Sequence, residues 1–277
     1  MTVSPSTLLA QTLIHALRLP AGCRVDQRVP KKLLLENGAA TTADKRLITD
    51  AIEEIQWVAA LKPNTIGVPD YRDSLREYLE IAVLAVTVRG VIKPASHSRL
   101  AELVHRAVPY PVLLLFIEAQ ALTLSLAHKR WAQNEADKVV LDGSPLSVTV
   151  SASLSEVNAA DSSQPDPAAV VQAESAFIDS LAVTRQPQST LHAVYQGWVD
   201  CVQALLAARL TGSYRTPTTP EQAAARRHAL ADCERLEADV RRLRRQAAKE
   251  KQLAHQVDLN LTLKRVQAEL AAARGKL

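Results

Sequence analysis

The residues best suited to chemistry are His128-Lys129-Arg130-Trp131, directly after an apolar stretch that predicts a strand. A histidine followed by two cations at a strand end can hold a phosphate or a nucleic-acid backbone. Other cations near the N-terminus can complete such a surface: Arg28, Lys31, Lys32, Lys45 and Arg46. The alternative is that these are solvated loop cations, or that Arg130 pairs with a carboxylate such as Asp137.

Two carboxylates, Asp70 and Glu80, permit a nuclease hypothesis. Pro69-Asp70 followed by Glu80 on a predicted strand resembles the acidic pair of restriction-type nucleases. That chemistry also uses a lysine two residues beyond the glutamate, and this position is Ala82. The match is therefore partial, and an unusual metal-dependent nuclease using Asp70 and Glu80 is kept as an alternative.

Other catalytic patterns are missing from the sequence. It contains no GxxxxGK[ST] phosphate loop, no GxSxG elbow and no HExxH motif. His105 lies beside the apolar stripe of a predicted helix. A half-buried histidine with a hydrogen bond is a simpler expectation there than a general base. We therefore expect no catalytic residue, no metal site and no cofactor.

The composition predicts a helix-rich protein with an uneven charge. Of the 277 residues, 47% are hydrophobic and only 4% aromatic, which disfavours a stacking surface for single strands. Basic and acidic residues number 17 and 15 over 1–150, 3 and 6 over 151–219, and 13 and 8 over 220–277. The C-terminal part thus carries the excess of positive charge, and this excess permits a polyanion partner.

Cysteine spacing and hydropathy indicate a cytoplasmic protein. Cys23, Cys201 and Cys233 are far apart and form no CxxC pair, so neither a disulfide framework nor a zinc site is indicated. No leader pattern and no apolar run of membrane-spanning length is present, so we expect no membrane association.

The first 150 residues predict a compact α+β domain with a mixed β-sheet and flanking helices. A first helix is expected over Ser6–Leu17. The apolar positions from Leu47 to Val58 fit a helical period, which predicts a second helix from a cap at Thr42 to a stop at Pro63. Later segments predict a buried strand, a helix, a hairpin and two short strands, at 79–88, 98–108, 112–127, 138–141 and 146–150.

A helical region follows this domain. Residues 151–172 are rich in Ser, Ala, Asp and Pro, which is typical of a linker or loop. An amphipathic pattern from Leu191 to Leu206 predicts a helical docking segment within 173–214. From Thr219, where Thr219, Pro220 and Gln222 form a start signal, residues 219–277 read as a long C-terminal coiled-coil or helical-hairpin tail.

The tail carries an apolar seam with alternating steps of three and four. The seam loses register near Glu250–Ala254 and then resumes, which allows either a stutter in one coiled coil or a bend into a helical hairpin. An exposed single helix is the third possibility, but its leucines would face water. The expected interface residues are Leu236, Val240, Leu243, Ala247, Leu263, Val266 and Leu270.

Several separate stretches together resemble one family. They include Arg28-Val29-Pro30-Lys31, Leu61-Lys62-Pro63, His105 to Pro111, Leu124 to Arg130, Tyr195-Gln196-Gly197-Trp198 and Val257 to Asn260. In this order they resemble the bacterial and archaeal domain of unknown function 4391 family. The resemblance implies no chemistry. It implies a context beside DNA methyltransferases and helicases in restriction-like antiphage loci.

The first functional hypothesis is a non-catalytic accessory or adaptor subunit of such a DNA-handling antiphage defence complex. It would bridge a larger enzyme, duplex DNA or both through basic surfaces and the C-terminal helices. The expected partners are a helicase or methyltransferase subunit, DNA, or a second copy of the chain in a homodimer. Direct nucleic-acid binding and the nuclease are the alternatives.

Overall fold

The computed structural model describes residues 5–133, 135, 138–151 and 166–277. Asp137 and most of the predicted 151–172 linker lie outside the described residues. The contacts divide the chain into two compact units. The first comprises residues 1–157 and 176–202, and the second comprises 158–175 and 203–277.

The first unit is built on a six-stranded mixed sheet of order β1-β2-β5-β6-β7-β10. These strands are β1 (Arg24–Arg28), β2 (Ile52–Leu61), β5 (Ile81–Val88), β6 (Val112–Ile117), β7 (Ala121–Leu126) and β10 (Leu146–Ser151). Only the β5–β6 pair is parallel within the described residues. Strand β5 is almost wholly apolar and buried, as a strand covered on both faces must be.

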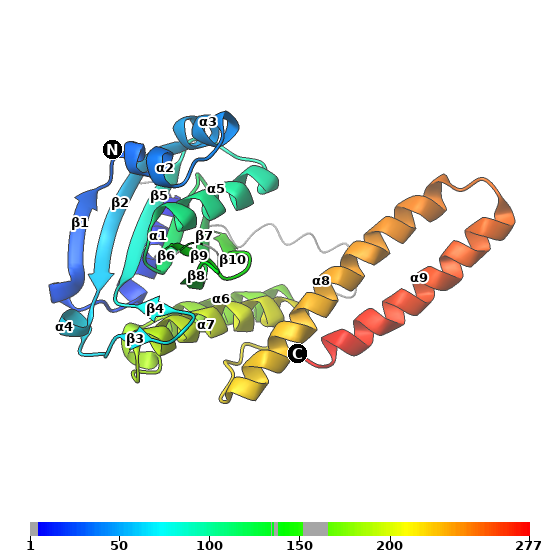
Figure 1. Ribbon diagram of the computed structural model, residues 1–277. Helices are drawn as coiled ribbons and strands as arrows, with labels where there is room; N and C mark the ends of the chain where they lie inside the picture. The colour runs from blue at the N-terminus through cyan, green and yellow to red at the C-terminus, as the bar shows by residue number, and fades with distance from the viewer. Residues whose placement is uncertain (1–4, 134, 136–137, 152–165) are drawn as a thin grey trace. The chain divides into compact units, whose positions relative to one another are not determined.

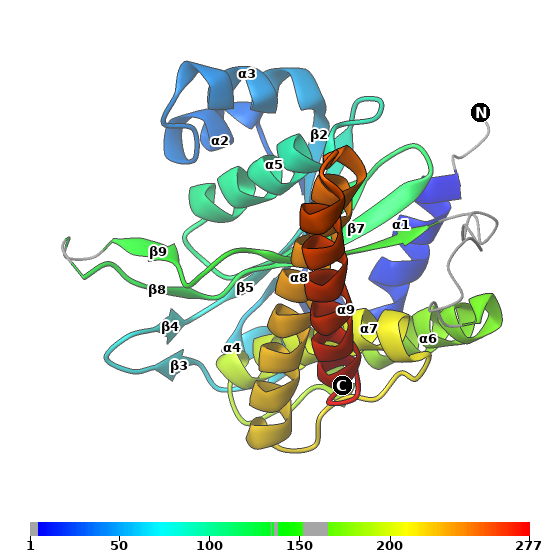
Figure 2. The ribbon, with the colours of Figure 1, turned by 90° about the vertical axis from the view of Figure 1, so that its right-hand side faces the viewer.

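The parallel β5–β6 pair is joined by the crossover helix α5 (Pro94–Ala107). Helices α2 (Lys31–Asn37), α3 (Thr42–Ala51) and α5 cover one face of the sheet, and α1 (Pro5–Ala16) lies on the other (Figures 1 and 2). The core under α5 includes Leu100, Leu103 and Val104, packed against β2, β5 and β6. Arg99 on α5 donates two 2.9 Å hydrogen bonds to Asp44 on α3, which ties these helices together.

Two small hairpins extend from the sheet. Strands β3 (Tyr71–Arg72) and β4 (Glu77–Tyr78) pair with each other, as do β8 (Lys129–Trp131) and β9 (Val139–Leu141). Short helices α4 (Pro63–Ile66), η1 (Ala21–Cys23) and η2 (Val183–Arg185) complete the connections. The strand predicted at 138–141 therefore exists, but it belongs to a two-stranded sheet of its own.

Most of the predicted elements of the first unit are confirmed, and the second predicted helix is wrong beyond Ala51. The cap is Thr41 and not the predicted Thr42, because the Thr41 side chain accepts a hydrogen bond from the backbone N–H of Asp44 and α3 begins at Thr42. It ends at Ala51, and the next residues form strand β2. Trp57, expected on a helix, therefore lies on the strand.

The second unit contains the two C-terminal helices, α8 (Pro220–Lys249) and α9 (Leu253–Arg274). The start signal is confirmed, because the Thr219 side chain caps α8 by accepting from the backbone N–H of Gln222. The chain turns at residues 250–252, where the seam was predicted to slip. The two helices run antiparallel and side by side (Figure 1). They are ordinary α-helices, and the long coiled coil is not shown.

The predicted seam is buried between these two helices. Leu236, Val240 and Leu243 of α8 pack with Val266 and Leu270 of α9, and Arg274 reaches Glu237 at 3.0 Å. The seam leucines are therefore shielded by the chain itself. Helices α6 (Pro167–Ser180) and α7 (Leu191–Thr211) contribute residues to both units, and Glu174 pairs with Arg209 within the second.

Candidate functional site

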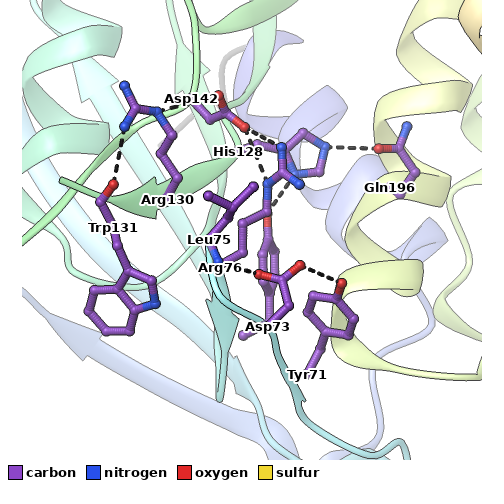
Figure 3. A network of polar contacts seen from close by, with 10 residues as sticks. Tyr71, Asp73, Leu75, Arg76, His128, Arg130, Trp131, Asp142 and Gln196 are labelled. Atoms are coloured by element: carbon purple, nitrogen blue, oxygen red, sulfur yellow. Dashed lines mark hydrogen bonds and ion pairs between the residues drawn. The ribbon is translucent and has the colours of Figure 1, made fainter. Parts of the chain in front are cut away.

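A polar network of the first unit centres on His128, just after β7 (Figure 3). The β3–β4 hairpin supplies Tyr71, Asp73, Arg76 and Tyr78. The start of α7 supplies His192 and Gln196, and the β8–β9 hairpin is followed by Asp142. We call this group the His128 network, and it joins three segments that are distant in the sequence.

Hydrogen bonds define the state of the His128 ring. The Gln196 amide donates to Asp200 Oδ1 at 2.9 Å, which directs its oxygen to Nε2 of His128 at 3.0 Å. Because that oxygen can only accept, Nε2 carries the proton and Nδ1 is the acceptor. The Tyr78 hydroxyl lies 2.5 Å from Nδ1 and donates to it. The donors thus run in one direction, from Tyr78 through His128 and Gln196 to Asp200.

Burial keeps this network neutral at its centre. Burial, assisted by the charges of His192 and Arg76, lowers the pKa of His128 to about 4. Burial also raises the pKa of the Tyr78 hydroxyl above its usual range, although Arg76 opposes the shift. Both ring nitrogens of His128 are engaged in hydrogen bonds, and Tyr78 is 0% exposed. Tyr78 and His128 therefore present no free proton acceptor to a substrate.

Aromatic rings and an ion pair surround the centre. The His192 ring stacks on Tyr71 with centroids 4.8 Å apart and meets Tyr78 edge-on at 4.9 Å. Arg76 forms two hydrogen bonds with Asp142, and Arg130 lies 3.7 Å from the same carboxylate. Figure 3 shows both arginines turned toward Asp142. The arrangement fixes the two hairpins against α7 and is suited to positioning.

The predicted phosphate-contact residues after β7 point in different directions. Lys129 is only 3% exposed, and its ammonium group donates to the carbonyl oxygens of His105 and Val108. Burial lowers the pKa of Lys129 to about 7. Arg130 lies 3.7 Å from the carboxylate of Asp142. This agrees with the alternative that Arg130 pairs with a neighbouring carboxylate. Two of the three residues therefore face the protein, since His128 is also largely enclosed.

Among the N-terminal cations, Lys31 lies at the other end of the sheet. Lys31 donates a hydrogen bond to the carbonyl oxygen of Ile52. Ile52 pairs with Val88, the last residue of β5. His128 follows Leu126, which pairs with Leu113 near the start of β6. The strand registers thus separate Lys31 from His128 along the length of the sheet.

Two of these N-terminal cations share an open hollow with two acidic residues. Arg28 and Lys31 line a cavity of about 330 Å³ together with Glu53 and Glu54, and Arg28 lies 3.5 Å from Glu54. Lys32, exposed on α2, is 3.6 Å from Glu36. Lys45 and Arg46 are exposed on α3. The cations do not form one continuous surface with the residues after β7.

The carboxylates of the nuclease hypothesis have different surroundings. Glu80 is 5% exposed, and its Oε2 lies 3.0 Å from Lys62 Nζ at the end of β2. Asp70 is exposed between α4 and β3. Among the described residues, no group of three or more His, Cys, Asp or Glu side chains is placed to hold a metal ion.

Sequence reasoning missed the β3–β4 hairpin and His192. Tyr71, Asp73 and Tyr78 lie in a segment where no apolar period marks a strand, and 50 residues separate Tyr78 from His128. His105 is fully buried, with Nε2 at 3.1 Å from Ser125 Oγ, and burial lowers its pKa to about 3. That environment matches the expected hydrogen-bonded histidine more closely than a general base.

Fold and network together define a mixed α+β protein with a buried polar junction and a C-terminal pair of helices. The chain belongs to the family described as Domain of unknown function (DUF4391), whose model matches residues 17–270. No curated protein and no solved structure matches the chain. None of the described helices combines the length and hydropathy needed to cross a membrane.

Proposed function

We propose that this protein is a non-catalytic accessory subunit of a DNA-handling assembly, and that the outer face of α8 contacts duplex DNA. The observation that supports it is a row of exposed cations on α8: Arg241, Arg242, Arg245 and Lys249. We call this row the α8 ridge. Residues three and four apart share one face of a helix, so the four cations form a continuous strip.

The α8 ridge lies on the side of α8 opposite the packed seam. Val240 and Leu243 pack against α9, Ala247 is also buried, and the ridge residues alternate with these three along the helix. Residues 241–251 contain six basic side chains and one acidic side chain. Because α9 satisfies the apolar seam, the cationic side of α8 remains available for a partner.

The neighbouring acidic residues compensate this charge only weakly. Arg242 lies 2.7 Å from Asp239, and Arg241 lies 3.9 Å from Glu237. These arginines are more than half exposed, and exposed ion pairs contribute about 0–1 kcal/mol. A phosphate can replace such a partner, since charge-assisted bonds from arginine to phosphate are strong.

The α8 ridge suits a polyanion better than the residues first singled out after β7. Lys129 uses its ammonium group inside the protein, and Arg130 shares Asp142 with Arg76. Bringing them to a phosphate would require breaking these contacts. The ridge needs no such rearrangement. The antiphage context, the bridging of a helicase or methyltransferase subunit and the absence of catalysis remain parts of the proposal.

The test is binding of the full chain to a labelled duplex of about 30 base pairs, followed by fluorescence anisotropy over a range of salt concentrations. We expect affinity that falls steeply with salt. The double variant R241E/R245E should weaken binding and reduce the slope of log K against log salt by about 2.

A matched control carries the same change in charge on the first unit. The variant K45E/R46E alters two exposed cations of α3, and we expect it to bind DNA like the wild type. Absence of binding at low salt would overturn the proposal. So would a K45E/R46E variant that loses more affinity than R241E/R245E, because the contact would then lie on the first unit.

A further inference from the structure

The outer face of α9 carries an apolar line that nothing within the described residues covers. Leu253, Val257 and Leu261 are 75%, 50% and 62% exposed. They follow one another at intervals of four, so they lie along one side of the helix. We call these three residues the α9 stripe. Large aliphatic side chains exposed in a row, rather than singly, mark an interaction surface.

The α9 stripe is distinct from the surface that packs on α8. Val266, Leu270 and Ala273 of α9 are buried in the seam, with Leu259 and Leu263 partly buried beside them. At about 100° per residue, the stripe is centred on the side of α9 that faces away from this seam. A partner bound there would therefore leave the α8–α9 packing intact.

The order of residues along the stripe is symmetric about Val257. Leu253 lies four residues before it, and Leu261 lies four residues after it. A two-fold axis through Val257 would place each leucine opposite the other leucine of an antiparallel copy, and Val257 opposite itself. Such self-complementarity is what an isologous interface requires.

The charges beyond the stripe have the same symmetry with opposite signs. Lys264 lies seven residues after Val257, and Glu250 lies seven residues before it. Lys264 is exposed and Glu250 is partly exposed. In an antiparallel pair of α9 helices, each lysine would lie near the turn at residues 250–252 of the other copy, where Glu250 accepts from the backbone N–H groups of Lys251 and Gln252 through Oε1. A foreign partner would not need this correspondence.

From these relationships we propose that two copies of the chain associate through the α9 stripe, with antiparallel α9 helices and a two-fold axis at Val257. The association goes beyond the DNA contact and does not depend on it. The α8 ridge belongs to the other helix of each pair and contributes no residue to this interface. A small interface of this kind is expected to form a dimer whose population rises with concentration.

The first measurement is the mass of the full chain in sedimentation from about 1 to about 100 µM, where mass action favours association at the upper end. We expect the mean mass to rise from 30.1 kDa toward twice that value. The variant L253S/L261S should stay at 30.1 kDa across the range. Both altered positions are exposed, so the variant should fold.

The second measurement locates the axis. The variant V257C should form an intermolecular disulfide with itself under mild oxidation, because the two side chains would meet at the axis. The matched control A238C places a cysteine at an exposed position of α8 and should remain monomeric. The native Cys23, Cys201 and Cys233 are all buried and give a low background.

The results separate the association from the DNA contact. A constant monomeric mass overturns the dimer, as does V257C that crosslinks no faster than A238C; the stripe would then be a surface for a different protein. L253S/L261S that sediments as a monomer and still binds DNA would support both proposals. If R241E/R245E loses salt-dependent DNA binding but still forms the dimer, this result would also support both proposals.

Discussion

Tyr78 and His128 are joined by a 2.5 Å hydrogen bond from the tyrosine hydroxyl to Nδ1 of the imidazole, across 50 residues of sequence. The bond connects the β3–β4 hairpin to the end of the main sheet, and His128 continues it to α7 through Gln196. The two hairpins consist of strands only two or three residues long. This polar junction, together with the burial of the Tyr78 ring, holds the β3–β4 hairpin in place.

Removing the Tyr78 hydroxyl should weaken the first unit. In Y78F, Nδ1 of His128 would be a buried acceptor without its donor, and we expect the free energy of unfolding to fall by about 1–3 kcal/mol. The measurement is urea denaturation followed by circular dichroism. Y71F makes the same chemical change at a less buried hydroxyl bonded to Asp73, and a smaller loss is expected. Equal losses would show that the junction has no special role.

The low pKa of His128 predicts a loss of stability on mild acidification. In the folded protein it is about 4, whereas the ordinary value is 6.5. Between these values the unfolded chain binds a proton that the folded chain does not. The free energy of unfolding should therefore fall as the pH falls from 6.5 toward 4, by up to about 1.4 kcal/mol per pH unit for one such group.

Above pH 6.5 His128 is neutral in both the folded and the unfolded chain, so its contribution to the free energy of unfolding does not change with pH. His105, with a pKa of about 3, should act in the same direction. Denaturation curves of H128N and the wild type, measured at several pH values, provide the check. The variant should be less stable throughout but should lose stability less steeply with acid. An unchanged slope would show that His128 does not cause the dependence.

Lys129 should be essential for folding rather than for DNA contact. Its ammonium group donates to the carbonyl oxygens of His105 and Val108 inside the protein. In K129E a carboxylate would face these oxygens without a donor, and we expect a loss of at least about 3 kcal/mol of stability. R130E, altered at a partly exposed side chain, should lose much less. A folded and stable K129E would contradict this placement of the lysine.

Strand β2 shows why part of the fold escaped prediction from sequence. Ile52, Ile55 and Val58 are spaced by three, which indicates a helix. The pairing of β2 with β5 shifts register between Ile52 and Glu54 and again between Trp57 and Ala59. Each bulge inserts an extra residue, so Ile52 and Ile55 both face the core although their separation is odd. The bulge between Ile52 and Glu54 thus accounts for part of the apparent helical period.

Strand β5, the 112–126 hairpin and α8 were predictable because their signals are local. An uninterrupted apolar run, a short turn after Glu118 and a capping residue at Thr219 each act within a few positions. The His128 network has no such signal. That Lys129 turns inward and Arg130 outward depends on the carbonyl groups of α5 nearby, which the sequence around residue 129 does not encode.

The α8–α9 pair offers a direct comparison between two leucines. Leu243 is 5% exposed in the seam, and Leu261 is 62% exposed in the α9 stripe. L243A should lower the free energy of unfolding of the second unit by about 2–5 kcal/mol, because a buried cavity remains. In dilute monomer, L261A should change it by no more than about 0.5 kcal/mol. If hydrogen exchange of the α8 and α9 amides responds equally to both changes, the seam does not hold these helices together.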